Sequence, residues 1–423
     1  MKALWKVLCL GALVLTAGVL PCHKAQAEGF AMTEWSARGL SLASGMVGRA
    51  DDASALAYNA AGITQLEGTH VMAGGAIVAP LGAITLDTPQ GKHTTETKPR
   101  GWTPAHFYLT HQLNDKIWLG LASFTRFGLG VEYGGAWPGK YNMYDVALQT
   151  VSVVPTIAIK VNDWLSLSLG GELLYGHFYE GTKLFDAQQG AERPIPFDND
   201  LQVDGQGLAG GVHVGAHVKF NEQWSAGLAY KSQMTLNMAG DAVFRKQHPD
   251  SAVPFYKNSN VDGTIQLPDS IAFGVAYKPL DNLSFEVGTV WTRWSVYDHL
   301  NLYFDKPFGQ HAKSRKDFND GWNFNASVEW KPYDWWALRA GAYYETPVVN
   351  EKHADFIIPS YGRTGLTLGT GFVWNNFTLD LAYAHLFINP LSYDSNKDLK
   401  NVSGGTSENC VANIYSVSVG YTF

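Results

Sequence analysis

Two residue patterns in this sequence have the spacing that cofactor chemistry uses. Gly205, Gly207 and Gly210 match G-x-G-x-x-G, and His213 and His217 stand four residues apart. The glycines would cradle a pyrophosphate only if a helix followed them, and the histidines would share a zinc ion only on one face of a helix. Both patterns lie in "GQGLAGGVHVGAHV", which alternates as a strand does. We therefore expect no nucleotide, no metal and no cofactor.

Adjacent carboxylates and nucleophiles are the other candidates for chemistry. Asp51 and Asp52 could form an acid–base pair, but they directly precede an alanine-rich run. An aspartate in that position more often caps a helix and lies near its positive end. The sequence has no G-x-S-x-G nucleophile elbow. We expect no catalytic residue, and a membrane-embedded lipid hydrolase remains an alternative.

The composition indicates which elements must position such residues. Gly (44), Tyr (20), Phe (21) and Trp (14) are abundant, and charged residues make up only 16%, with no acidic or basic block. This composition argues against a disordered chain and against a nucleic-acid partner. It suits a β-protein with large apolar and aromatic surfaces.

The N-terminus predicts export through a signal peptide over residues 1–27. Lys2 and Lys6 precede an apolar run that ends at Leu20, and Ala25-Gln26-Ala27 has the small-x-small pattern of signal peptidase cleavage. The apolar run is shorter than the ~20 residues of a spanning helix, which argues against a membrane anchor.

The cysteines bear on the same prediction. Cys22 could mark a lipoprotein signal, but Pro21 fits poorly where a small residue is expected. Cleavage before Glu28 would leave Cys410 as the one cysteine, which cannot make an internal disulfide.

Period-two alternation dominates the rest of the chain. In "WLSLSLGGELLYG", large apolar residues share one face of a strand and small or polar residues share the other. The apolar face holds Leu165, Leu167, Leu169, Leu173 and Tyr175, and the other holds Ser166, Ser168, Gly170 and Glu172.

The connections distinguish a membrane barrel from a soluble sandwich. Six tight polar turns alternate with longer connections, so they separate seven hairpins, or 14 strands. Short turns at one rim, long loops at the other and aromatic residues at strand ends are typical of outer-membrane barrels. The turns are Asn114-Asp115, Asn162-Asp163, Asn221-Glu222-Gln223, Asp281-Asn282, Tyr333-Asp334 and Asn375-Asn376.

The C-terminal stretch "NIYSVSVGYTF" supports this interpretation. It alternates as a strand and ends on the aromatic Phe423, which resembles the signal by which the barrel assembly machinery recognises its substrates. We expect a 14-stranded antiparallel barrel in the outer membrane of a Gram-negative bacterium, in contact with lipid and lipopolysaccharide.

The segment "EGFAMTEWSARGLSLASGMVGRADDASALAYNAAGITQL" carries a family resemblance. It is similar to the start of the FadL family of outer-membrane transporters for long-chain fatty acids, which includes aromatic-hydrocarbon transporters. Collinear matches follow over nearly the whole chain: "FTRFGLG", "LPDSIAFGVAYK", "VWTRWS", "WALRAGAYYETPVVNE", "IPSYGR" and "LDLAYAHLF".

The resemblance implies an N-terminal hatch over residues 28–67 that plugs a barrel over residues 68–423. It also implies loop capture of a hydrophobic ligand, binding in the lumen, and lateral release through a kink in the third strand. Gly128 is apt for such a kink because glycine tolerates the backbone bend. The kink candidates are Ser123, Phe124, Thr125, Arg126, Phe127 and Gly128.

The hatch motif differs from the family pattern at one position. The family has Asn-Pro-Ala where this chain has Asn59-Ala60-Ala61. We carry over Asn59 and Ala61, with Asp51 and Asp52, as motif positions. We expect Asp51 or Asp52 to cap the short helix and Asn59 to tie it to the wall near the third strand.

The sequence favours passive uptake of a hydrophobic compound, foremost a long-chain fatty acid, as the function. Phe30, Met32 and Trp35 are the candidate lining residues, and Arg126 or Lys183 is the candidate partner of a ligand carboxylate. An aromatic-hydrocarbon transporter is the nearest alternative. A structural or adhesive barrel and an open porin are more distant ones.

Overall fold

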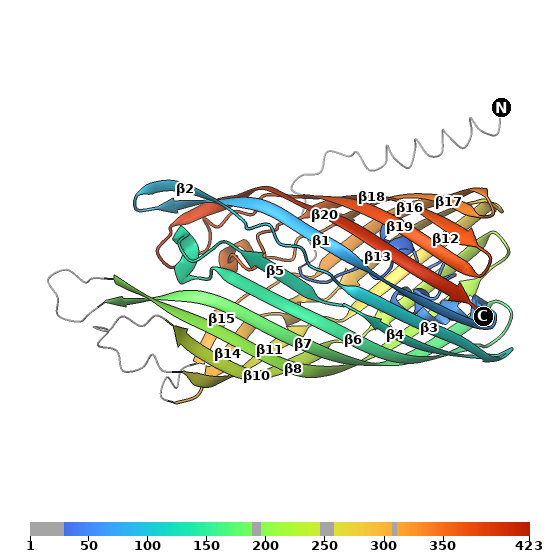
Figure 1. The fold of residues 1–423 in the computed structure, drawn as a ribbon, viewed down its shortest axis with the longest axis horizontal. Helices are drawn as coiled ribbons and strands as arrows, with labels where there is room; N and C mark the ends of the chain where they lie inside the picture. The colour runs from blue at the N-terminus through green and yellow to red at the C-terminus, as the bar shows by residue number, and fades with distance from the viewer. Residues whose placement is uncertain (1–28, 188–195, 246–257, 307–310) are drawn as a thin grey trace, which may run out of the picture.

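The last strand pairs with the first and closes the sheet into a barrel (Figure 1). The computed structural model describes residues 29–187, 196–245, 258–306 and 311–423. In it, β20 runs antiparallel to β1, with His70 opposite Thr422 and Asp87 opposite Gly404. The sheet has 20 β segments. Five wall strands are each interrupted into two segments and β2 is an added hairpin arm, so the 20 segments make up the predicted 14 wall strands and this arm.

The wall strands follow one another around the barrel in chain order, each antiparallel to the next. From first to fourteenth they are β1 (Thr69–Thr88), β3 (Ala105–Asn114), β4 with β5 (Ile117–Phe124, Gly128–Glu132), β6 (Asp145–Lys160), β7 (Leu165–Ala187), β8 (Pro196–Lys219), β9 with β10 (Trp224–Lys231, Met234–Arg245), β11 with β12 (Ser259–Leu267, Ser270–Leu280), β13 with β14 (Leu283–Thr292, His299–Phe304), β15 with β16 (His311–Arg315, Gly321–Tyr333), β17 (Trp336–Glu345), β18 (Arg363–Trp374), β19 (Phe377–Ile388) and β20 (Gly404–Thr422). The arm β2 (Gly91–Glu96) pairs with β1 alone.

The predicted alternation matches the two faces of the wall. In β7, Leu169 is 56% exposed on the outer face, whereas Glu172 is 5% exposed on the inner face. In β20, Tyr415 and Val417 face outward and Ser418 faces inward. An outward apolar face with an inward polar face is the arrangement that a bilayer requires of a barrel. The glycine motif at 205–210 lies within β8 and is strand, as expected.

The six predicted turns are confirmed, and all lie at one rim. They join strands such as β6 to β7 and β18 to β19, at the end of the barrel that also holds the C-terminus (Figure 1). The longer connections lie at the opposite rim, and two of them contain the short 3-10 helices η2 (Pro138–Tyr141) and η4 (Glu351–His353). A third 3-10 helix, η3 (Trp294–Val296), lies in the interruption between β13 and β14.

Residues 29–67, here called the N-terminal segment, lie inside the barrel (Figure 1). The segment holds α2 (Ala37–Ser41), α3 (Ala55–Tyr58) and η1 (Ala60–Gln65). Ser36 caps α2 because its Oγ accepts the Gly39 N–H at 3.0 Å. Inward-facing wall residues hold the segment, for example Ser418, whose Oγ accepts the Ala37 N–H at 2.8 Å.

None of the helices in the described residues has the length and hydropathy that crossing a bilayer requires. The predicted signal peptide, residues 1–27, lies outside the described residues.

Candidate functional site

The third wall strand is interrupted between Phe124 and Gly128. Buried backbone groups need partners, so the ones released by this break must bond elsewhere. The N-terminal segment supplies two of them: the Met32 N–H donates to the Arg126 carbonyl at 3.0 Å, and the Gly128 N–H donates to the Phe30 carbonyl at 2.9 Å.

Two side chains complete the bonding of the break. The Trp35 indole N–H donates to the Thr125 carbonyl at 2.8 Å. Thr150 of β6 makes two hydrogen bonds to the Phe127 backbone: its hydroxyl accepts the Phe127 N–H at 3.2 Å and donates to the Phe127 carbonyl at 2.6 Å. The break is therefore an ordered feature whose geometry depends on the N-terminal segment.

The Arg126 side chain fastens the break to strands further around the wall. Its guanidinium lies 2.8 Å from Glu172 of β7 and donates to the carbonyls of Ser232 and Pro268 at 3.1 and 3.0 Å. Glu172 also accepts a hydrogen bond from Ser152 at 2.6 Å. Arg126 is 3% exposed and its guanidinium is engaged by these protein groups, so its expected contact with a ligand carboxylate stays a prediction. It is a structural ion-pair partner.

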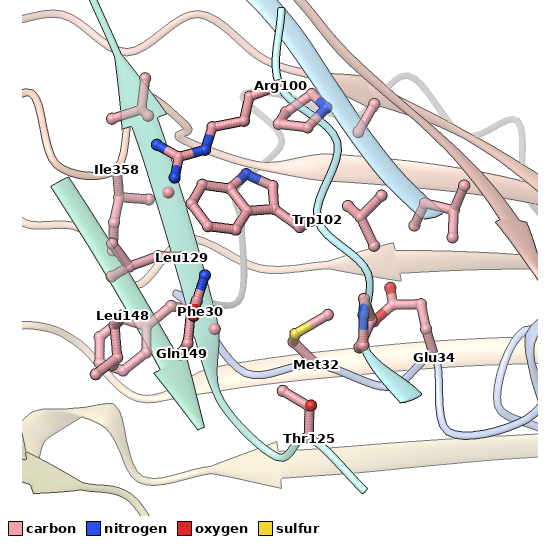
Figure 2. A pocket seen from close by; sticks show the side chains of 18 of the residues that line it. Phe30, Met32, Glu34, Arg100, Trp102, Thr125, Leu129, Leu148, Gln149 and Ile358 are labelled. Atoms are coloured by element: carbon pink, nitrogen blue, oxygen red, sulfur yellow. The ribbon is translucent and has the colours of Figure 1, made fainter. Parts of the chain in front are cut away.

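A cavity of about 540 Å³ adjoins the break (Figure 2). Its lumen side includes Phe30 and Leu148, which are 3% and 1% exposed. Its lining also includes Phe107 and Val151, which are 38% and 48% exposed on the outer face of the wall. The cavity therefore extends from the lumen to the bilayer-facing side of the barrel.

The lining is mostly apolar with a few polar groups. Its apolar part includes Met32, Leu129 and Ile358, and its polar part includes Glu34 and Arg100 (Figure 2). Burial raises the pKa of the Glu34 carboxyl, against the opposing effect of the Arg363 guanidinium. A concave apolar site with few polar groups suits a hydrophobic ligand with at most one polar end.

The predicted lining residues separate into two groups. Phe30 and Met32 line the cavity, together with Ser123, Thr125 and Gly128 from the predicted kink.

Trp35 and Lys183 lie away from the cavity lining. Trp35 packs between Tyr58 and Phe124, with ring centroids 5.1 and 5.2 Å away. Lys183 pairs with Asp200 at 3.4 Å. Neither residue lines this cavity, and a contact of either one with the ligand stays a prediction.

Asp51 and Asp52 belong to an ion-pair network rather than to a helix cap as predicted. Arg38 lies 2.6 Å from Asp51 and 2.9 Å from Asp52, and it also pairs with Glu329 of β16 at 3.0 Å. The helix α3 has only four residues, and Ser54 is its N-cap without a side-chain cap bond. Asp52 does accept the Ser54 N–H at 2.8 Å. The aspartates thus bind Arg38, which in turn fixes the N-terminal segment to the wall.

Asn59 ties the N-terminal segment to a different strand from the expected one. Its side-chain amide donates to the carbonyls of Val47 and Ala216 at 2.9 and 3.0 Å, and Ala216 lies in β8, the sixth strand. Its Oδ1 accepts the Ala61 N–H at 3.4 Å. The expected position near the third strand is therefore wrong, although Asn59 does bond to the wall.

The two histidines of β8 face the lumen, as a strand requires. His213 lies 2.7 Å from Glu172, and His217 lies 2.9 Å from the Gly48 carbonyl. They contact different partners, so their four-residue spacing is that of a strand and does not join them in one site.

Sequence reasoning missed Glu34, Arg100 and Trp102 of the cavity lining. The sequence does contain a feature that points to Arg100 and Trp102. Arg100 and Trp102 lie between Pro99 and Pro104, and proline cannot donate to a strand ladder. That pair of prolines could have marked residues 99–104 as an irregular part of the wall.

Comparison with known proteins assigns the family. A family model described as outer membrane protein transport protein (OMPP1/FadL/TodX) matches residues 18–423. The chain belongs to this family. As a member it is an outer-membrane transport protein of a Gram-negative bacterium and not an enzyme.

Two curated relatives illustrate the sequence similarity within the OMPP1/FadL/TodX family. Outer membrane protein P1 of Haemophilus influenzae is 24% identical, over 97% of this chain and 99% of the relative. The long-chain fatty acid transport protein of Salmonella typhi is 22% identical, over 86% of this chain and 88% of the relative.

Solved structures show the same fold. A Pseudomonas aeruginosa FadL homologue superposes with a TM-score of 0.80 at 18% identity, covering 94% of this chain and 100% of the other. The Pseudomonas putida toluene transporter TodX superposes with a TM-score of 0.70 at 16% identity, also covering 94% and 100%.

Proposed function

We propose that this protein takes up hydrophobic compounds, foremost long-chain fatty acids, by lateral release into the outer membrane. The ligand is captured among the extracellular loops, enters the 540 Å³ cavity and leaves sideways past the break in the third strand. The observation that carries this proposal is the lining of that cavity, which joins Phe30 and Leu148 on the lumen side to Phe107 and Val151 on the bilayer side.

Lateral release suits the physical properties of such a ligand. A fatty acid crosses the polysaccharide of the outer leaflet poorly, so it needs an apolar site that shields it from water. Transfer from that site into the bilayer never returns the alkyl chain to water. The process therefore needs no energy source besides the ligand gradient.

The N-terminal segment serves as the hatch in this proposal, which the sequence placed over residues 28–67. Its support is the pairing of Phe30 and Met32 with Gly128 and Arg126, which couples the segment to the strand break. A movement of residues 30–32 would release two backbone hydrogen bonds of the break and change the shape of the exit.

Two cationic side chains favour a fatty acid over a hydrocarbon. Arg100 and Arg363 both line the apolar cavity, and Arg363 is already paired with the buried Glu345, so a carboxylate head would lie beside Arg100 while the chain contacts the apolar lining. The Arg100 guanidinium is only loosely paired, at 3.6 Å from Asp145. The name of the Salmonella typhi relative agrees with this choice. An aromatic hydrocarbon is the alternative, favoured by the Phe30 and Trp102 rings of the lining.

Uptake by a deletion strain of the native host tests the proposal. We expect loss of labelled oleate uptake, restored when the gene is supplied on a plasmid. Loss of toluene uptake alone would select the aromatic alternative. If uptake of both oleate and toluene is unchanged, the proposed function is wrong.

A further inference from the structure

Part of the wall beside the break has no backbone pairing. The pairing of β3 with β4 ends at Phe107 and Ser123. Above it, the next backbone contact across the gap is the hydrogen bond from Lys98 N–H to the Glu132 carbonyl at 2.8 Å. Residues 99–106 and 124–131 therefore face each other without a backbone hydrogen bond between them. Side chains must close the wall here.

The Trp102 indole is the side chain that crosses this gap. It reaches from the irregular segment 99–104 to Gly130 of β5, where a Cβ atom would collide with its six-membered ring. Gly128, two residues earlier on the same face of β5, is matched in the same way by Met32, whose sulfur would lie 2.8 Å from a Cβ atom. Figure 2 shows Trp102 between Arg100 and Met32, facing the cavity. The two glycines thus make the surface on which these side chains lie.

Trp102 is held by its backbone, whereas its ring makes no hydrogen bond. Its N–H and carbonyl both bond to Val78 of β1, at 2.9 and 2.8 Å. The indole N–H has no hydrogen-bond partner among the described residues. Turning the ring therefore breaks no hydrogen bond. It gives up the contact with Gly130 and the stacking of the Arg100 guanidinium, whose Cζ lies 4.3 Å from the ring centroid.

We propose that Trp102 is the side chain that closes the lateral exit and sets the width of ligand that can pass. This inference rests on the proposed function. Because only one side chain turns and the backbone on both sides is held, the turned indole still occupies part of the gap, so the open exit is narrower than the gap would be without the ring. It passes a single alkyl chain or a single aromatic ring and excludes wide fused compounds such as pyrene.

A reversible cross-link across the gap tests this inference in living cells. Trp102→Cys and Gly130→Cys are combined with Cys410→Ser, which removes the native thiol from the cavity lining. A short, cleavable bis-thiol reagent should lower oleate uptake at least tenfold, and a reducing agent should restore it. The two single-cysteine chains, treated alike, are the controls. Uptake that continues unchanged in protein shown by mass to be cross-linked would overturn the inference.

Ligand width provides a second test that needs no cross-link. Trp102→Ala should admit pyrene at several times the wild-type rate, whereas Trp102→Phe should behave as the wild type does. Heat-modifiable gel mobility verifies that each variant is folded. Equal exclusion of pyrene by folded Trp102→Ala would overturn the inference. Wild-type oleate uptake in the same cells reports separately on the proposed function, which can stand if Trp102 proves unimportant.

Discussion

At the scale of single residues, the buried pair of Arg126 and Glu172 shows why a side chain cannot be assigned a role without its partner. An arginine beside a predicted kink resembles a free cation that could bind a carboxylate. Glu172 lies 46 residues further along the chain, and nothing local in the sequence joins the two. The fold brings them to 2.8 Å, with Glu172 fully buried, and the pair becomes part of the architecture of the break.

Removing one partner of this pair should destabilise the barrel. Arg126→Met leaves the Glu172 carboxylate buried without its cation, which typically costs about 3–5 kcal/mol. Denaturant midpoints of the folded barrel, followed by gel mobility, measure the loss. Adding Glu172→Gln should recover part of it. The matched control is Lys160→Met, since the Lys160–Asp163 pair is exposed and worth under ~1 kcal/mol. Unchanged stability with weakened oleate binding would instead make Arg126 a ligand-binding residue.

At the scale of elements, the broken third strand and the N-terminal segment form one unit. The break exposes backbone groups that only the segment 30–32, Trp35 and Thr150 satisfy. The segment in turn is held by long-range contacts on other sides of the barrel. One example is the Glu286 carboxylate of β13, which accepts the backbone N–H groups of Val47, Gly48 and Arg49 at 2.8 to 2.9 Å. Removing one such contact should therefore lower the local stability of the N-terminal segment and leave the barrel wall folded.

Asn59→Ala tests this order of stability. It removes the hydrogen bonds to Val47 and Ala216 and leaves two carbonyl groups without that partner, a cost of about 1–3 kcal/mol. We expect faster amide hydrogen exchange over residues 47–61, lower oleate uptake and unchanged heat-modifiable mobility. Thr64→Ala is the control, since Thr64 contacts the wall through one hydroxyl, at 2.7 Å from Ser166. Collapse of the folded mobility in Asn59→Ala would make Asn59 necessary for the barrel itself.

At the scale of the whole molecule, the barrel could be predicted because its determinants are local. Alternation within β7 and turns such as Asn162-Asp163 are each complete within a few residues of sequence. The candidate site is assembled differently. Arg38 reaches Glu329 across 291 residues, and Trp102 stands on an irregular segment whose place is set by Val78 and Gly130. Patterns of period two carry no information about such contacts. The kink position itself came from family resemblance, and recognition of Phe423 by the assembly machinery stays a prediction.

The route of the ligand is the central claim, and photo-cross-linking tests it most directly. Outer membranes that contain the protein are illuminated with a diazirine analogue of oleate, and the adducts are mapped by mass spectrometry. We predict adducts on residues 29–34, 97–107 and 128–132, and at Val151 on the outer face, all suppressed by excess oleate. Suppressible adducts confined to the lumen at the turn rim, such as residues 221–225 and 276–284, would instead indicate passage straight through the barrel and contradict lateral release.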